Sequence, residues 1–342
     1  MMPNKPAVFA AIFVFAIFVV IFNVTFFNTA IKDQHLRNQS SLQNGRVAVK
    51  KLNFIQERSY MERMEYYKSR YNYQAPESYP NQRQRGETCG EYPSYTSYFN
   101  LTGTKERSAN NEDLTLYRTL FLNEDGPPIR GSMLEIGAFN GITESNSRFF
   151  DTCLGWDTLL IEGNPNVFKD LVGNRPQAHR FNFAPTCTLE EEAQNKTIQF
   201  DNTIFTNAGL ADGSVETAYT KNRVKEPVIV PCGHLTNVLL DVFPQGHITL
   251  FSLDVEGSEP LVLNQIDFDQ VFIELFMIEN FNGFCKLGQE CESRNQFRKI
   301  MQDNGYERFS NNIQKSDLFI HPKSSYLQRV QKHESQKVAA VK

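Results

Sequence analysis

From residue 130 onward, short apolar runs alternate with stretches long enough to form helices. The runs at 134–136, 157–161, 178–184, 247–253 and 271–279 are typical of buried strands. A helix over Gln296 to Asn304, which ends at Gly305, precedes a closing pair of strands at 306–310 and 317–321. This order predicts an α/β fold with a seven-stranded, mostly parallel sheet and one antiparallel strand.

Additional short strands are expected before the fourth main strand. Thr197 to Phe200, Thr203 to Phe205 and Val228 to Val230 have strand-like composition, and Ala211 to Ser214 carries a hairpin turn signal. We place the folded domain at residues 111–323, which is long enough to bury one sizeable core.

The amino-terminal segment Ala7 to Phe27 is apolar and carries no charge. Its 21 residues are enough to span a bilayer as a helix. A cleaved signal peptide usually has a shorter apolar core and small residues before the cut. The pattern therefore predicts an uncleaved transmembrane anchor at 7–27, preceded by a short cytoplasmic tail at 1–6.

The orientation of this anchor follows from features on its carboxyl side. The positively charged residues next to it mildly favour the opposite orientation. However, all six cysteines lie beyond the anchor, as do glycosylation sequons at Asn38, Asn100 and Asn195. We expect a single-pass type II membrane protein of the Golgi or endoplasmic reticulum, with its domain in the lumen.

The remaining segments are polar. Residues 28–110 are expected to form a largely irregular stem with a possible helix at 50–70, and residues 324–342 a disordered tail. The formal net charge of −4 and the lack of a basic patch give no indication of a nucleic-acid partner. The oligomeric state is not readable from the pattern.

The cysteines do not have the spacing of a metal site. They include no C-x-x-C pair and no neighbouring pair of histidines, so no metal is expected. Cys285 and Cys291 flank a short glycine-containing loop and are the expected disulfide pair. The partners of the other cysteines cannot be deduced.

The first strand ends in a glycine turn, Glu135 to Gly141. A dinucleotide-binding loop has a glycine where Phe139 stands, because the backbone must approach a pyrophosphate. S-adenosylmethionine has no phosphate, so the turn favours this cofactor over NAD. We expect Glu135 to hold its ammonium end, with Gly137, Ala138 and Gly141 forming the turn. The alternative is a tight turn without a ligand.

Two other strands also end in acidic residues. Glu162 closes the second strand and precedes Asn164, a spacing that suits hydrogen bonds to ribose hydroxyls. Asp254 and Glu256 follow the fourth main strand, before a helix that we expect Ser258 to cap. Because ligands of open α/β sheets bind at the carboxyl ends of the strands, these acids are expected to share one crevice.

The segments GSMLEIGAFNGITESNSRFF, LGWDTLLIEGNPN and FSLDVEGSEPLVL together resemble the FkbM family of methyltransferases. The resemblance covers residues 112–323. It implies the class I methyltransferase (Rossmann-like) fold, S-adenosylmethionine (S-adenosyl-L-methionine) as the cofactor and O-methylation as the reaction. In that fold Phe183 and Ala184, at the end of the third strand, would flank the adenine, although both could simply pack in the core.

Methyl transfer to a hydroxyl needs an aligned acceptor and a nearby base. We assign Asp254 to the methionine end of the cofactor and Glu256 to the acceptor. His234 and His247 are alternative bases. The compartment suggests a glycan hydroxyl as the acceptor, while small-molecule and lipid hydroxyls stay open.

A second hypothesis is a protein without catalysis. The layout of anchor and domain also resembles Star-like trafficking proteins, which would make the chain a cargo-binding protein on a methyltransferase scaffold. The acidic residues Glu135, Glu162 and Asp254 favour retained cofactor binding instead.

Overall fold

The computed structural model describes residues 58–77, 89, 94–100, 106–123, 129–200, 227–280 and 291–341. All of them belong to one compact unit, Arg58–Lys342. Among these residues, no helix has the length and apolar character needed to cross a bilayer. The expected anchor at 7–27, the strand at 203–205 and the turn at 211–214 lie outside the described residues.

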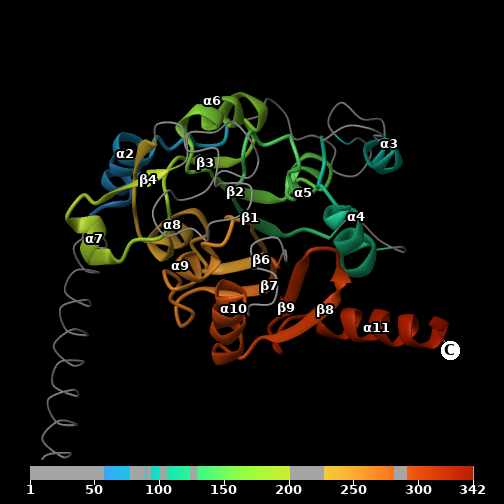
Figure 1. Ribbon diagram of the computed structural model, residues 1–342. Helices are drawn as coiled ribbons and strands as arrows, with labels where there is room; N and C mark the ends of the chain where they lie inside the picture. The colour runs from blue at the N-terminus through green and yellow to red at the C-terminus, as the bar shows by residue number, and fades with distance from the viewer. Residues whose placement is uncertain are drawn as a thin grey trace, which may run out of the picture. The chain divides into compact units, whose positions relative to one another are not determined.

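The centre of the domain is a seven-stranded sheet, drawn in Figure 1. Its strands are β1 (Ser132–Ile136), β2 (Asp157–Ile161), β3 (His179–Phe181), β6 (His247–Leu253), β7 (Phe272–Glu279), β8 (Glu307–Ile313) and β9 (Ser316–Ile320), in the order β3-β2-β1-β6-β7-β9-β8. Only β9 runs antiparallel to its two neighbours. This confirms the predicted α/β fold with one antiparallel strand. Outside the sheet, β4 (Thr197–Phe200) and β5 (Val228–Pro231) form an antiparallel pair where two of the extra strands were predicted.

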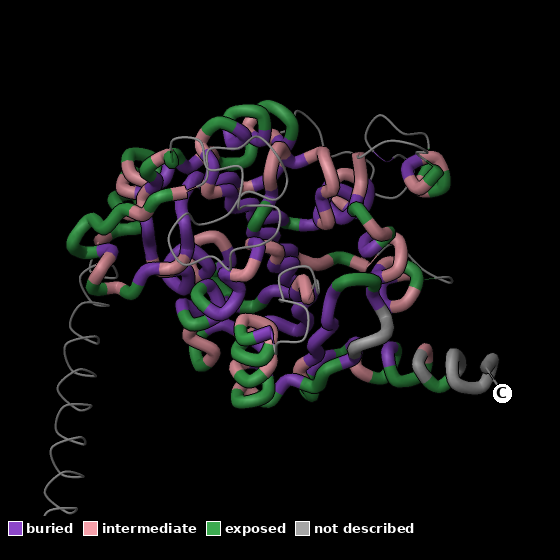
Figure 2. Tube along the Cα trace, in the orientation of Figure 1, coloured by how far each residue is buried: buried purple, intermediate pink, exposed green. Residues whose placement is uncertain are grey.

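Successive residues of each central strand point to opposite faces of the sheet, and both faces are covered. Leu134 and Phe251 belong to one hydrophobic cluster, whereas Met133 and Leu250 belong to another. The central strands are accordingly buried along nearly their whole length, as Figure 2 shows. Burial on both faces explains why these strands are continuous apolar runs in the sequence.

Helices cover the two faces in separate groups. One cluster contains buried residues of α2 (Tyr60–Tyr71), α8 (Leu235–Val242), α9 (Glu259–Leu263) and α10 (Glu292–Asp303). The other contains residues of α3 (Tyr95–Phe99), α4 (Glu112–Leu116), the π-helix η1 (Tyr117–Phe121), α5 (Arg148–Thr152) and α11 (Leu327–Val341). Helix α6 (Pro165–Asn174) packs on Leu160 of β2, and the short α7 (Leu189–Ala193) precedes β4.

Two of these helices correct the predicted domain limits. Helix α2 lies within the expected stem, yet Tyr67 and Tyr71 are fully buried, and Tyr67 contacts Phe181 of β3 edge to face. Helix α11 lies within the expected disordered tail, yet Val330 is fully buried in the cluster that contains Phe121. Buried residues of both segments complete the core from outside the expected domain.

Disulfides join Cys89 to Cys153 and Cys187 to Cys232. Cys291 is also disulfide-bonded. Cys285 lies outside the described residues, so its pairing with Cys291 stays a prediction.

Candidate active site

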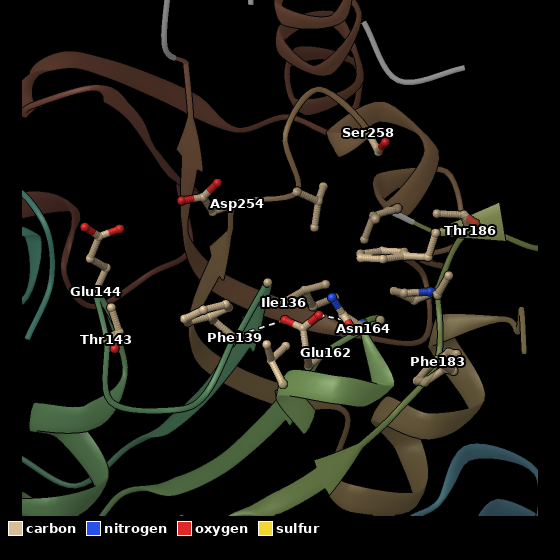
Figure 3. Close-up of a pocket in the computed structure, with 18 residues that line it drawn as sticks. Ile136, Phe139, Thr143, Glu144, Glu162, Asn164, Phe183, Thr186, Asp254 and Ser258 are labelled. Carbon is tan, nitrogen blue, oxygen red and sulfur yellow. Dashed lines mark hydrogen bonds between the residues drawn. The ribbon is translucent and has the colours of Figure 1, made fainter. Parts of the chain in front are cut away.

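A cavity opens at the carboxyl ends of β1, β2 and β6, the edge of the sheet that the sequence predicted. Figure 3 shows its wall, in which Phe139, Glu162, Phe183, Asp254 and Ser258 are labelled. The remaining wall residues include Gly137, Asn164, Ala184, Pro185, Thr186 and Phe200. Three separate strand ends thus contribute to one binding space.

Glu162 connects the turns that follow β1 and β2. Its Oε2 accepts a hydrogen bond from the backbone N–H of Phe139 (2.8 Å), and its Oε1 accepts one from the backbone N–H of Asn164 (2.6 Å). Burial raises the pKa of this carboxyl to about 7, and these hydrogen bonds oppose the rise. The two backbone donors fix the orientation of the Glu162 carboxyl at the cavity wall.

The first turn has a left-handed backbone at several positions. Gly137 has a φ of 88°, and a Cβ atom there would overlap the carbonyl oxygen of Asp254. Phe139 has a φ of 48°, which is uncommon for a residue with a side chain. Gly137 therefore allows β1 and β6 to meet closely, while Phe139 supplies a side chain to the wall.

Gly141 and Ala138 belong to the same turn but are not among the residues that line the cavity. A Cβ atom on Gly141, whose φ is 76°, would collide with the side chains of Leu171 and Arg175. Ala138 is buried against α6. Both residues support the turn from behind.

Glu135 also lies away from the cavity wall. Its carboxylate accepts hydrogen bonds from the hydroxyls of Ser145 (2.9 Å) and Ser147 (2.5 Å) and from the backbone N–H of Asn146 (2.7 Å). Burial raises its pKa, and the charge of Arg175 opposes that rise. Glu135 thus fastens the loop before α5, and its position does not support the expected contact with a cofactor ammonium group.

Arg175 completes this buried network. Its guanidinium donates to the Asp151 carboxylate (2.9 Å from Nε) and to the carbonyl oxygen of Gly141 (3.0 Å). Both side chains of the Arg175–Asp151 pair are 1% exposed. The glycine turn is therefore anchored by charged groups beneath it.

Phe183 and Ala184 line the cavity together with Thr186, and their contact with an adenine stays a prediction. Tyr71 of α2 stacks on the Phe183 ring with centroids 4.3 Å apart. The Tyr71 hydroxyl donates to Glu192 (2.6 Å). Helix α2 therefore supports the apolar end of the cavity.

Asp254 faces a second residue that the sequence analysis did not select, Glu279 at the end of β7. The register pairs Leu253 with Ile278, so the following residues, Asp254 and Glu279, lie side by side. Their carboxyl groups share a hydrogen bond, and together with Glu256 they place three carboxylate oxygens within 4.8 Å of one another. Glu279 could have been found by applying the rule of carboxyl strand ends to the fifth main strand.

Asp254 and Glu279 form a coupled pair of buried carboxyl groups. Burial raises the pKa of both groups, and the charge of Asp254 raises that of Glu279 further. Two adjacent buried carboxyl groups cannot both be ionised cheaply, so the pair favours a state in which the two groups share one proton.

A second, polar cavity of about 260 Å³ adjoins the first. Glu256, Glu279, Asn146 and Lys315 are among its lining residues, and Glu144 and Asp254 line both cavities. The structure thus brings Asp254 and Glu256 to one place, as expected, and adds Glu144 and Glu279 to them.

The loop after β6 is not held by a Ser258 cap, which the sequence analysis had predicted. Ser258 occupies the position before α9, but its side chain makes no capping hydrogen bond. Its hydroxyl is buried without a hydrogen-bond partner among the described residues, and it lines the first cavity. Glu259 holds the loop instead, because its Oε1 accepts from the backbone N–H groups of Val255 (3.3 Å) and Gly257 (3.1 Å).

The two candidate histidine bases line neither cavity. His247 lies at the amino end of β6, at the opposite edge of the sheet, where it contacts Glu274 (3.1 Å). His234 precedes α8, and burial lowers its pKa to about 4.

Residues 135–308, just over half of the 342-residue chain, match the methyltransferase FkbM domain. Among proteins with curated descriptions, none matches the chain. Solved structures with a similar fold include methyltransferase FkbM from Methylobacillus flagellatus KT, at 14% identity and a TM-score of 0.32, with 60% of this chain and 48% of that chain covered.

Two further similar structures contain ligands. The fibrillarin of Aeropyrum pernix was solved with S-adenosyl-L-methionine (11% identity, TM-score 0.29, 55% of this chain and 65% of that chain). The O-methyltransferase of Bacillus cereus was solved with SAH (8% identity, TM-score 0.33, 61% of this chain and 77% of that chain). This chain spans less than two thirds of the Aeropyrum and Methylobacillus proteins. These structural similarities are weak, and the family follows from the match over residues 135–308: the chain belongs to the FkbM methyltransferase family.

Proposed function

We propose that this protein is an S-adenosylmethionine-dependent O-methyltransferase. Two neighbouring cavities share Asp254 in their walls, and this arrangement is the main support for the proposal. One cavity has the groups that a nucleoside cofactor needs, and the other is polar and suits an acceptor. A transferred methyl group would have to pass between them at this point.

The wall of the first cavity fits the cofactor. The Glu162 carboxyl would accept hydrogen bonds from the ribose hydroxyls, and Phe183 and Ala184 would flank the adenine. The methionine end would lie towards Gly137 and Asp254, where a buried carboxyl group can face an ammonium group. The hydroxyl of Ser258, which has no hydrogen-bond partner among the described residues, is a further group that a ligand would satisfy.

When bound, the cofactor supplies an electrophilic methyl group whose carbon–sulfur bond breaks with both electrons going to sulfur, as the bond to the acceptor oxygen forms. The contribution of the protein is to align the acceptor oxygen and to take up its proton. Asp254 lines both cavities and marks the position at which the methyl group would be transferred. Glu256, which lines only the polar cavity, receives the proton of the acceptor hydroxyl.

For the acceptor we propose a glycan hydroxyl in the lumen of the Golgi or endoplasmic reticulum, reached by a type II protein anchored at 7–27. The disulfides Cys89–Cys153 and Cys187–Cys232 support an oxidising compartment. The uncharged apolar segment and the three sequons support entry into the secretory pathway.

The test is transfer of a labelled methyl group from S-adenosylmethionine to glycans by the full-length chain purified in detergent. We expect Asp254→Ala to abolish transfer while Glu307→Gln, a change at an exposed residue of β8, leaves it intact. Full activity of Asp254→Ala would contradict the role of Asp254. Glycans from cells with and without the gene should differ by one methyl group, and identical glycan masses would exclude the glycan acceptor.

A further inference from the structure

One glycosylation sequon, Asn195-Lys196-Thr197, lies entirely within the described residues. Asn38 lies outside them, as do the two residues that complete the sequon of Asn100. N-linked glycosylation adds a bulky, polar group to the asparagine of an Asn-x-Ser/Thr motif, and a folded domain can accommodate this group only at its surface. The position of Asn195 in the fold is therefore a test of whether its sequon can carry a glycan.

Asn195 lies in the turn between α7 and β4, on the left of Figure 1. Residues 193–197 are all exposed, so the whole sequon is at the surface. The backbone N–H of Asn195 donates to the carbonyl oxygen of Glu192 (2.9 Å) and closes the turn. Asn195 has a φ of 58°, a left-handed conformation that asparagine adopts more readily than most residues. The sequon thus lies on a defined, solvent-exposed turn.

The two ends of the Asn195 carboxamide have different surroundings. Its Oδ1 accepts a hydrogen bond from Nη1 of Arg70 in α2 (3.0 Å). The Nη2 of the same guanidinium donates to the carbonyl oxygens of Lys196 (3.0 Å) and Cys232 (3.3 Å). Among the described residues, none is hydrogen-bonded to Nδ2 of Asn195. Arg70 therefore holds the carbonyl end of the amide and leaves the nitrogen, the atom to which a glycan is attached, accessible.

A glycan at this position would not obstruct the proposed active site. None of residues 195–197 lines either cavity. Strand β4 begins at Thr197 and reaches the first cavity only at its other end, where Phe200 is among the lining residues. The turn that carries the sequon is thus separated from the cavity wall by the length of this strand.

We propose that Asn195 carries an N-linked glycan. The donor would be a lipid-linked oligosaccharide diphosphate, used by an oligosaccharide transferase. Nδ2 forms a bond to the anomeric carbon of the donor, the bond from this carbon to the diphosphate oxygen breaks with both electrons going to oxygen, and the amide loses one proton to a base of the transferase. The amide carbonyl is unchanged, so the hydrogen bond from Arg70 is retained.

This inference rests on the lumenal location given under the proposed function, but it does not depend on methyl transfer. The disulfide Cys187–Cys232 supports that location independently of the sequon.

The experiment uses the full-length chain produced in eukaryotic cells. A peptide N-glycosidase converts a glycosylated asparagine to aspartate, and in heavy-oxygen water the new carboxyl group takes up the heavy isotope. Mass spectrometry of the peptide that contains residue 195 then reports the modification. We expect labelled aspartate at this position. A peptide that retains asparagine at 195 after the enzyme treatment would overturn the inference.

Two substitutions of Thr197 form a matched pair. Both change the same exposed residue and leave Asn195 in place, but only Thr197→Ser preserves the sequon. We expect Thr197→Ala to increase the gel mobility of the chain by the step of one glycan, as Asn195→Gln does, and Thr197→Ser to migrate as the wild type. Equal mobility of the wild type and a cooperatively unfolding Thr197→Ala variant would contradict a glycan at Asn195.

The oxidation state of Cys187 and Cys232 separates the glycosylation site from the compartment. If these cysteines are oxidised and Asn195 carries no glycan, the glycosylation inference fails and the lumenal location stands. If they are free thiols and Asn195 carries no glycan, both fail. Methyl transfer is assayed separately, so a glycan at Asn195 on a chain that transfers no methyl group would uphold the inference and contradict the proposed enzyme.

Discussion

At the scale of single residues, the carboxyl group of Glu162 has the most specific surroundings in the first cavity. Both of its oxygens accept backbone hydrogen bonds, one from each of two neighbouring turns. The Glu162 carboxyl orders these turns, and in the proposed function its remaining acceptor sites would face the ribose hydroxyls of the cofactor.

We therefore expect Glu162→Ala to weaken S-adenosylmethionine binding by about a hundredfold, which corresponds to two charge-assisted hydrogen bonds. Calorimetry of the full-length chain measures this. The control is Glu292→Gln, at an exposed residue of α10, which should bind as the wild type does. Wild-type affinity of Glu162→Ala would remove Glu162 from the cofactor site.

The raised pKa of Glu162 predicts a pH dependence of binding. Since the pKa lies at about 7, the carboxyl is protonated below this pH and ionised above it. Ribose hydroxyls donate to the ionised form, so the affinity for S-adenosylmethionine should fall as the pH drops below about 7, approaching tenfold per pH unit. Calorimetry from mildly acidic to mildly alkaline pH tests this, and a profile identical to that of Glu162→Gln would contradict it.

Glu135 and Glu162 illustrate what the sequence can and cannot predict at this scale. Each lies at the carboxyl end of an apolar run and within two residues of a glycine, so both fit a similar pattern. They differ in their partners, because Glu135 is enclosed by Ser145 and Ser147, which come from a loop ten residues further on. The strand ends were predictable, but which acid faces the ligand depends on contacts that a local pattern does not contain.

At the scale of secondary structure elements, the central strands are predictable, whereas the packing of two helices into the core is not. A helix at 50–70 was expected, which overlaps α2, but as part of the stem. The strands are buried on both faces, which leaves a continuous apolar run in the sequence. Helices α2 and α11 each insert a few residues into a core formed by distant segments: Tyr67 contacts Phe181, and Val330 packs in the cluster of Phe121. Their polar composition matches that of a stem or tail.

The contribution of helix α2 to the core can be tested by mutation. Tyr71 is fully buried, stacks on Phe183 and donates to Glu192, so Tyr71→Ala should lower the free energy of unfolding by about 3–5 kcal/mol. Tyr60 on the same helix is 50% exposed, and Tyr60→Ala should change the free energy of unfolding by less than about 0.5 kcal/mol. Denaturant unfolding of both variants gives the comparison. Equal effects would mean that α2 is not part of the core.

The loop that supports the glycine turn depends on the buried pair of Arg175 and Asp151. Removing one partner leaves an uncompensated charge, so Asp151→Ala should destabilise the fold by about 3–5 kcal/mol. Asp303 pairs with Lys299 on the exposed surface of α10, and Asp303→Ala should cost less than about 1 kcal/mol. If Asp151→Ala destabilised the fold no more than Asp303→Ala does, the Arg175–Asp151 pair would not be needed for stability.

At the scale of the whole molecule, two disulfides connect segments that are far apart in the chain. They close loops with sequence separations of 64 and 45 residues. Constraint of the unfolded chain by loops of this length stabilises the fold by about 4 kcal/mol per disulfide. Cys89–Cys153 ties a segment outside the family match to α5.

We accordingly expect reductant to lower the thermal midpoint of the chain markedly, and the Cys187→Ala/Cys232→Ala double variant to lose part of this sensitivity. Alkylation of free thiols during cell lysis should find these cysteines oxidised if the domain lies in the lumen of the secretory pathway. Free thiols at Cys187 and Cys232 would contradict both the pairing and the proposed compartment.

Calorimetry with the full-length chain measures whether this member of the FkbM methyltransferase family binds S-adenosylmethionine. We expect binding at one site per chain, strongly weakened by Glu162→Ala and unchanged by Glu307→Gln. A wild-type chain that is folded, as judged by cooperative unfolding, and binds no S-adenosylmethionine would contradict this expectation.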